Sequence, residues 1–268
     1  MIELLQFPFM QRALIAGIIL ALLLALLGIF VILRKMAFWG EGIAHASLAG
    51  IAIGLLVSYN PLITAIIFAV IFAILVYVLE RKTSLSGDVI IGILFTSSMA
   101  LGIVLINLQN NYQPDLLSFL FGNILAIKTS ELYLMIIFSI LVLLFLLIYK
   151  RQLTLLTFDR ESAYLAGINV DAFDLIFYIC LGIAVVLGVK ILGIILVSAL
   201  LIIPASCAKL VARSFGMLEY LSIVFAEVIV ILGLVISYYL NLPSGAIIIL
   251  TGTALFLCLV FLKRLKVI

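Results

Sequence analysis

Long apolar runs separated by short polar breaks fill almost the whole chain. Each run is close to the 17–25 residues, roughly, that an α-helix needs to cross a bilayer. Turn-forming residues such as Asn60-Pro61 and Ser86-Gly87 stand in the breaks. The pattern predicts an all-α polytopic membrane protein with about nine transmembrane helices, over residues 13–33, 39–58, 62–79, 88–108, 131–149, 172–188, 191–208, 218–239 and 245–262.

The basic residues test this count, because cytoplasmic loops of membrane proteins are enriched in Lys and Arg. With the amino terminus outside, only Arg12, Lys128 and Lys190 of the 15 basic residues remain outside. The main alternative has eight spans. It arises because 113–128 reads as a short external or re-entrant helix, and because two spans almost touch around Lys190.

Composition supports a membrane protein built as a single transmembrane domain over residues 1–268. Hydrophobic residues make up 68% of the chain and charged residues 10%, whereas soluble domains carry about 25% charged residues. The first apolar run is long enough to span and is followed directly by more spans, so we expect no cleavable signal peptide. The three cysteines, Cys180, Cys207 and Cys258, lie in apolar runs and are interpreted as packing residues.

The segment 38–50 carries the most unusual chemistry in the chain. It contains the only histidine, His45, and the only tryptophan, and it places Glu41 four residues before that histidine. Residues four apart lie on one face of a helix, so the carboxylate and the imidazole point the same way. Small residues also recur at every fourth position, which lets another membrane helix approach closely. They are Gly42, Ala46, Gly50 and Gly54.

Glu41 and His45 form a candidate site for a divalent transition metal. Ionisable residues at membrane depth cost roughly 2.5–3.5 kcal/mol on insertion scales and usually serve a function. Imidazole and carboxylate suit first-row divalent metals. Two ligands are too few, since zinc sites take about four, but a two-fold dimer would supply two of each. The other interpretation is a buried polar pair that only ties helices together.

Glu227 lies near the middle of its predicted span, with no basic residue within a helical turn. Two interpretations stay open: a protonated or hydrogen-bonded carboxyl facing the bundle interior, or a charge that lines a cation path. Two common enzyme motifs are missing from the sequence. A His-Glu-x-x-His metalloprotease needs two histidines, and no GxxxxGK[ST] phosphate-binding loop occurs, so ATP hydrolysis by that route is excluded.

The longest polar interruption runs from Lys150 to Asp174, on the cytoplasmic side in this topology. Within it, residues 157–167 read as a short amphipathic helix that Thr157 or Asp159 could cap and that Gly167 could end. A short helix in such a loop has no core of its own. We therefore expect it to lie on the membrane or to dock into a partner.

Five stretches form an ordered set of motifs over nearly the whole chain: 36–50 (MAFWGEGIAHASLAG), 88–95 (DVIIGILF), 157–167 (TFDRESAYLAG), 201–210 (LIIPASCAKL) and 237–246 (SYYLNLPSGA). In sequence and in order they resemble the membrane permeases of metal-uptake ABC transporters of the zinc, manganese and iron class. The third stretch is also similar to the Glu-Ala-Ala-x-x-x-Gly pattern with which ABC permeases meet their ATPases. Each motif alone is weak, and the ordered set is specific.

The resemblance implies a homodimer in the cell membrane, two cytoplasmic ATPase subunits and an extracellular metal-binding protein that delivers the cargo. It implies that Glu41 and His45 bind the transported metal, and that Asp159, Glu161, Ala163 and Gly167 belong to the segment that couples to the ATPase. Manganese, zinc and iron remain open as cargo. We expect membrane lipid to surround the chain. We expect neither a permanently bound cofactor nor a nucleic-acid partner.

The chain departs from the family pattern at three positions. Glu41 replaces the usual Asp and lengthens the ligand arm by one methylene, Ala49 replaces the usual Pro, and Asn241 replaces an Asp in an external turn.

Two other functions stay open: a stand-alone secondary carrier or channel for metal ions, and a purely structural membrane subunit. A carrier is expected to show inverted repeats and several intramembrane carboxylates, and we detect no convincing repeat.

Overall fold

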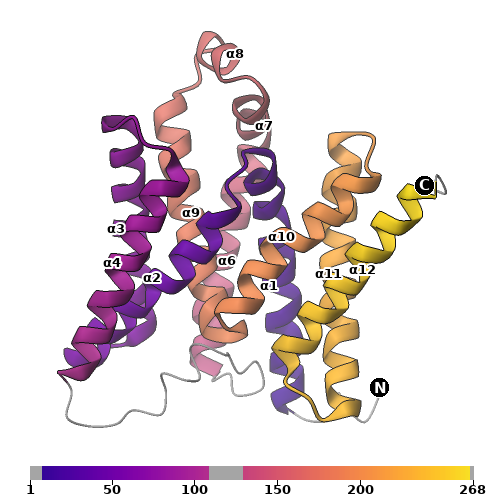
Figure 1. The fold of residues 1–268 in the computed structure, drawn as a ribbon, viewed down its shortest axis with the longest axis horizontal. Helices are drawn as coiled ribbons and strands as arrows, with labels where there is room; N and C mark the ends of the chain where they lie inside the picture. The colour runs from indigo at the N-terminus through magenta and orange to yellow at the C-terminus, as the bar shows by residue number, and fades with distance from the viewer. Residues whose placement is uncertain (1–7, 109–128, 266–268) are drawn as a thin grey trace.

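The computed structural model describes residues 8–108 and 129–265, and within these ranges it contains helices and no strand (Figure 1). The helices are α1 (Pro8–Leu33), α2 (Ala37–Leu56), α3 (Pro61–Lys82), α4 (Gly87–Asn107), α6 (Thr129–Ile148), α7 (Lys150–Phe158), α8 (Arg160–Leu165), α9 (Val170–Leu192), α10 (Ile194–Val211), α11 (Phe215–Leu240) and α12 (Ser244–Arg264). All except α7 and α8 run along the bundle. The two short helices project beyond it at the end drawn uppermost in Figure 1.

Nine helices in the described ranges are long and apolar enough to cross a membrane, which confirms the prediction of nine spans. The ambiguity around Lys190 is resolved by Gly193, which separates α9 from α10 with a φ of +86° that favours glycine. Helix α1 already includes Pro8, the first described residue, and the candidate span within it starts at Met10, whereas the sequence predicted a start at residue 13. The segment 113–128, expected as a short external helix, lies outside the described residues.

Local capping explains several helix starts. Asn60 lies just before α3, and its side chain accepts a hydrogen bond from the backbone amide of Leu62 in that helix. Ser214 caps α11 in the same way. Each side-chain oxygen satisfies one of the backbone amides that the first turn of a helix leaves free.

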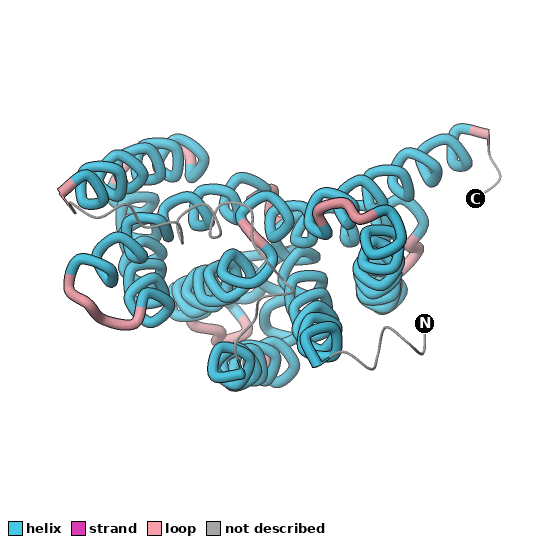
Figure 2. Tube along the Cα trace, turned by 90° about the horizontal axis from the view of Figure 1, so that it is seen from below, coloured by secondary structure: helices cyan, strands magenta, loops and turns pink. Residues whose placement is uncertain are grey.

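The core of the bundle is formed by α1, α2 and α9, whose spans are mostly buried, while α4 and α12 are mostly exposed. Figure 2 shows the bundle from below, with some of the long helices seen nearly end-on and others, such as the helix that leads to the C-terminus, running obliquely. The exposed face of a helix that spans a membrane meets lipid, another protein chain or a water-filled cavity. Cys180 and Cys207 are buried, in line with a packing role, whereas Cys258 is exposed on α12.

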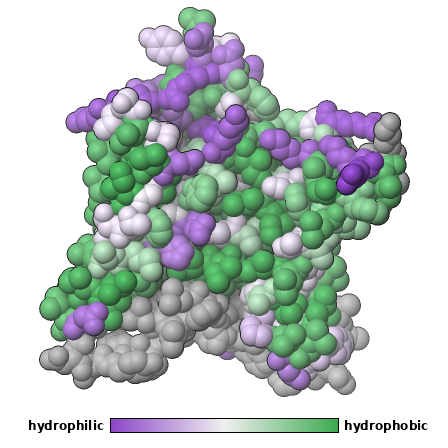
Figure 3. All heavy atoms as spheres, viewed as in Figure 1, coloured by the Kyte–Doolittle hydropathy of each residue, from purple (hydrophilic) through white to green (hydrophobic). Residues whose placement is uncertain are grey.

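Polar residues gather at one end of the molecule. Figure 3 shows hydrophilic residues over α7, α8 and the neighbouring helix ends, above a largely apolar surface on this face. Arg34, Arg81 and Arg160, all assigned to the cytoplasmic side, meet at Asp174 and therefore share this end. This agrees with the alternation of spans that the positive-inside pattern predicts.

Candidate functional site

Helix α2 carries Glu41 and His45 one turn apart. The Glu41 side chain is exposed and that of His45 is half-buried. The imidazole lies against the Phe95 ring of α4, with ring centroids 5.4 Å apart and planes at 52°. Within the part of the chain that the structure describes, neither side chain has a hydrogen-bond or ion-pair partner. Both therefore keep their metal-binding atoms free.

Small residues hold α2 close to its neighbours, as predicted. Gly42 faces Ile91 of α4, whereas Gly50 and Gly54 face the first turns of α3. A Cβ on Gly50 would lie 2.7 Å from the Cα of Ala65. The small residues of α2 thus face two different helices, α3 and α4, and close packing on both fixes the position of α2 between them.

Replacing Gly50 with alanine is expected to lower the free energy of unfolding by about 1–3 kcal/mol, because the added methyl group meets the backbone of α3. Gly92→Ala is the matched control, since a Cβ on Gly92 meets no atom within 4 Å. Thermal unfolding in detergent measures both variants. An equal midpoint for the two would contradict the close packing of α2 on α3.

The described residues of one chain do not complete a metal site. Among the described residues, no group of three His, Cys, Asp or Glu side chains is placed to hold a metal ion. Glu227 lies half-buried on α11, which packs on α10, α12 and α1, while α2 packs mainly on α4 and α3. Glu41 and His45 therefore lie one turn apart on α2, whereas Glu227 lies on a helix that packs mainly on other parts of the bundle.

Helix α8 lies in the predicted 157–167 segment and is shorter than expected. Asp159 caps it, accepting a hydrogen bond from the Ser162 amide at 3.0 Å, and Thr157 belongs instead to the preceding helix α7. The hydrogen bonds from Ser162 lower the pKa of Asp159, so the cap is retained at neutral pH. Gly167 follows α8 with a φ of +78°.

The side chains of α8 divide into a buried and an exposed set. Ala163 is fully buried against Leu156 and Val170, in a small cluster separate from the main core. Tyr164 and Leu165 are 73% and 84% exposed. Large apolar side chains with this exposure at a polar end of the molecule are typical of a protein interface.

A cluster of charges that the sequence reasoning did not find lies beneath α8. Asp174, near the start of α9, is 5% exposed and pairs with Arg34 at 3.0 Å and Arg160 at 2.6 Å. Burial lowers the pKa of the Arg34 guanidinium, and the adjacent Asp174 carboxylate opposes that change. An aspartate inside a predicted span was the signal available in the sequence.

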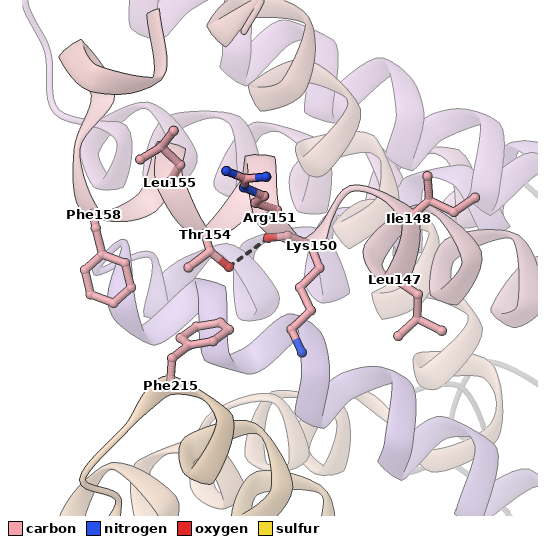
Figure 4. Close-up of a pocket in the computed structure, with 8 residues that line it drawn as sticks. All are labelled: Leu147, Ile148, Lys150, Arg151, Thr154, Leu155, Phe158 and Phe215. Carbon is pink, nitrogen blue, oxygen red and sulfur yellow. Dashed lines mark hydrogen bonds between the residues drawn. The ribbon is translucent and has the colours of Figure 1, made fainter. Parts of the chain in front are cut away.

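Two cavities lie at this same end of the molecule. One, of about 240 Å³, is lined by Tyr77, Glu80, Arg81, Arg160, Asp174 and Tyr178. The other, of about 600 Å³, lies between α7 and the start of α11 (Figure 4). Its walls include Phe158 and Phe215 and the basic residues Lys150 and Arg151, but no His, Cys, Asp or Glu. The larger cavity is therefore unsuited to a metal ion.

Comparison with known proteins gives matches over nearly the whole chain. The sequence profile of the ABC 3 transport family matches residues 6–263. The manganese transport system membrane protein MntC of Listeria innocua is 35% identical over 253 residues, covering 94% of this chain and 90% of MntC. The high-affinity zinc uptake system membrane protein ZnuB of Haemophilus influenzae is 34% identical over 259 residues, covering 97% of this chain and 99% of ZnuB.

Among solved structures, PsaBC from Streptococcus pneumoniae in complex with Fab contains a similar chain. The two chains are 34% identical and superpose with a TM-score of 0.85, covering 96% of this chain and 92% of the other. The similarity therefore extends to the arrangement of the helices as well as to the sequence.

Proposed function

Because the chain belongs to the ABC 3 transport family and is a multi-pass protein of the cell membrane, we propose that it is the permease subunit of an ATP-driven metal importer. The cargo is a divalent transition metal, manganese or zinc, with iron as a third candidate. Relatives named for manganese and for zinc are equally similar to the chain. Their similarity supports a divalent transition metal as the cargo. Transport measurements must distinguish manganese from zinc.

The observation that carries the proposal is the exposed Glu41 carboxylate one turn from His45 in a membrane-spanning helix. A carboxylate that faces lipid is costly, so another protein surface must cover it. A second copy of the chain would cover it and bring a second Glu41 and His45. Two carboxylates and two imidazoles meet the need of zinc for about four ligands and also suit manganese.

The ATPase is a separate chain in this proposal, since the sequence contains no phosphate-binding loop. The exposed Tyr164 and Leu165 of α8 support a docking role for this helix. Asp159 caps the helix, Glu161 is exposed beside the apolar pair, and Ala163 anchors it to α7 and α9. An extracellular metal-binding protein would deliver the cargo, and no resident cofactor is needed. Glu227 is a further candidate on the metal route.

Reconstitution in liposomes tests the proposal. The chain, its ATPase and its binding protein are expected to accumulate manganese or zinc inside the vesicles only when ATP is present on the ATPase side. Metal uptake by the chain alone, without ATP or partner, would identify a secondary carrier or channel instead.

Gly167→Ala is expected to reduce copurification of the ATPase. Gly167 has a φ of +78°, a conformation that is about 1–2 kcal/mol less favourable for a residue with a Cβ. The backbone of the variant is therefore expected to shift and to displace the end of α8. Gly216→Ala is the matched control, because Gly216 has no positive φ and no atom within 4 Å of an added Cβ. Affinity purification through a tag on the permease measures the ATPase recovered. Equal recovery from both variants would argue against docking at α8.

A further inference from the structure

We propose that Asp174 relays movement of α8 to α2 by exchanging its arginine partners. The inference rests on the proposed function, in which an ATPase moves α8. Arg160, which belongs to α8, is the partner that responds to this movement, and Asp174 is a positioning residue that acts on the metal-binding helix through its neighbours.

Three arginines from three helices or helix ends meet at the Asp174 carboxylate. Arg34, just after α1, donates from Nη1 to Oδ1 at 3.0 Å. Arg160 of α8 donates from Nη2 to Oδ2 at 2.6 Å, and Nη2 of Arg81, in the last turn of α3, lies 3.9 Å from the same Oδ2. Two guanidinium groups therefore compete for one carboxylate oxygen.

Burial separates the fixed partner from the exchangeable ones. The side chains of Arg34 and Asp174 are only 11% and 7% exposed, so this pair cannot part without leaving a buried charge unpaired. Arg160 is 59% exposed and can leave for water. Arg34 is also fixed from other sides, since its Nε donates to the Thr157 hydroxyl and its guanidinium lies over the Phe177 ring.

When Arg160 leaves, Oδ2 needs a new donor, because a buried carboxylate without a partner is costly. Arg81 stands nearest, and the buried Nη2 of Arg34 has no hydrogen-bond partner among the described residues. The site therefore has two compensated arrangements, one with Arg160 on Oδ2 and one with Arg81 or the free Arg34 nitrogen there. Arg81 already pairs with Asp171 of α9, so its transfer to Asp174 would shift the end of α3 along α9.

A chain of contacts leads from Asp174 to α2. Tyr178 follows one turn later on α9, so it lies on the same face as Asp174. Its hydroxyl donates to Glu80 of α3 at 3.0 Å, and its ring centroid lies 4.0 Å from that of Trp39. Trp39 is 2% exposed and stands two residues before Glu41. A shift of Tyr178 therefore acts on the turn of α2 that carries the metal ligand.

The polar cavity of about 240 Å³ lies along this chain of contacts, with Arg81, Arg160, Asp174 and Tyr178 in its wall. Close-packed interiors resist side-chain movement. The cavity gives the arginines room to change partners without repacking the apolar core.

Arg160→Gln tests the relay in the complete complex with its ATPase and binding protein, in liposomes. The variant keeps Arg34 and Arg81, so Asp174 remains compensated and the bundle is expected to fold. ATPase assembly and ATP hydrolysis are expected to persist. The number of metal ions transported per ATP hydrolysed is expected to fall about tenfold, within the usual range of coupling between sites. Arg160→Lys, which keeps the positive charge, is expected to restore most of that ratio.

Arg151→Gln is the matched control, since Arg151 is an exposed arginine of α7 outside this cluster, and its ratio is expected to equal that of the wild type. An unchanged ratio in Arg160→Gln would overturn the relay. Loss of ATPase assembly in that variant would overturn it as well and make Arg160 a docking residue. If the wild-type complex itself transports no metal with ATP, the proposed function fails instead.

Discussion

His45→Ala is expected to lower metal uptake by more than about 100-fold, because it removes the nitrogen ligand that we propose for the transported metal. Loss of a group that merely supports a ligand already costs about 10–100-fold in metal affinity or activity. Glu41→Gln, which removes the charge and keeps the shape, is expected to have a comparable effect. Uptake of radioactive manganese or zinc by cells that rely on this permease measures the loss.

Ser47→Ala is the matched control for these variants. Ser47 is a buried polar residue of the same helix, and its hydroxyl donates to the Ala44 carbonyl at 2.6 Å within that helix. Its uptake is expected to stay near the wild-type level, and all three variants are expected to retain the ATPase. Normal uptake by His45→Ala would remove the histidine from the transport route.

Asp174→Asn is expected to lower the free energy of unfolding by about 3–5 kcal/mol, because it leaves the nearly buried Arg34 charge without its counter-ion. Denaturant unfolding in detergent, followed by tryptophan fluorescence, is a direct measure, since Trp39 packs on Tyr178 one turn from Asp174.

Asp171→Asn is the control for this loss of stability. Asp171 also pairs with Arg81, but its side chain is 61% exposed. An exposed ion pair contributes about 0–1 kcal/mol, so the variant is expected to unfold almost like the wild type. Equal losses for Asp171→Asn and Asp174→Asn would mean that burial of the Asp174 pair does not contribute to stability.

The features that the sequence predicted are those that local pattern determines. Apolar runs of bilayer length gave nine spans, and four-residue spacing placed Glu41 and His45 on one face and Gly50 against a neighbouring helix. Thr157 and Asp159 were both candidates for the cap of α8, and the structure has Asp159 in that role. Gly167, expected to end the helix, follows it with a positive φ.

The features that were missed depend on contacts between distant parts of the chain. Arg34, Arg81 and Arg160 were interpreted only as markers of the cytoplasmic side, and their convergence on Asp174 requires the packing of α1, α3 and α9. Helix α7 was read as part of a polar loop. Trp39 was noted as the only tryptophan, but its contact with Tyr178 could not be read from one sequence.

Glu227 shows the limit of reasoning from one chain. The sequence left two roles open for this carboxyl in the middle of a span, packing inside the bundle or lining a cation path. In the described residues of a single copy, α11 packs mainly on α10, α12 and α1. Whether Glu227 approaches the metal route depends on how two copies meet, and its role stays a prediction.

The most direct test of the account is anomalous X-ray scattering from manganese or zinc in a structure of the dimer. The account predicts a metal peak between the two copies of α2, with a His45 nitrogen at about 2.0–2.1 Å for zinc and Glu41 oxygens from both copies in contact. A metal peak elsewhere, or a His45 side chain turned toward lipid, would contradict it.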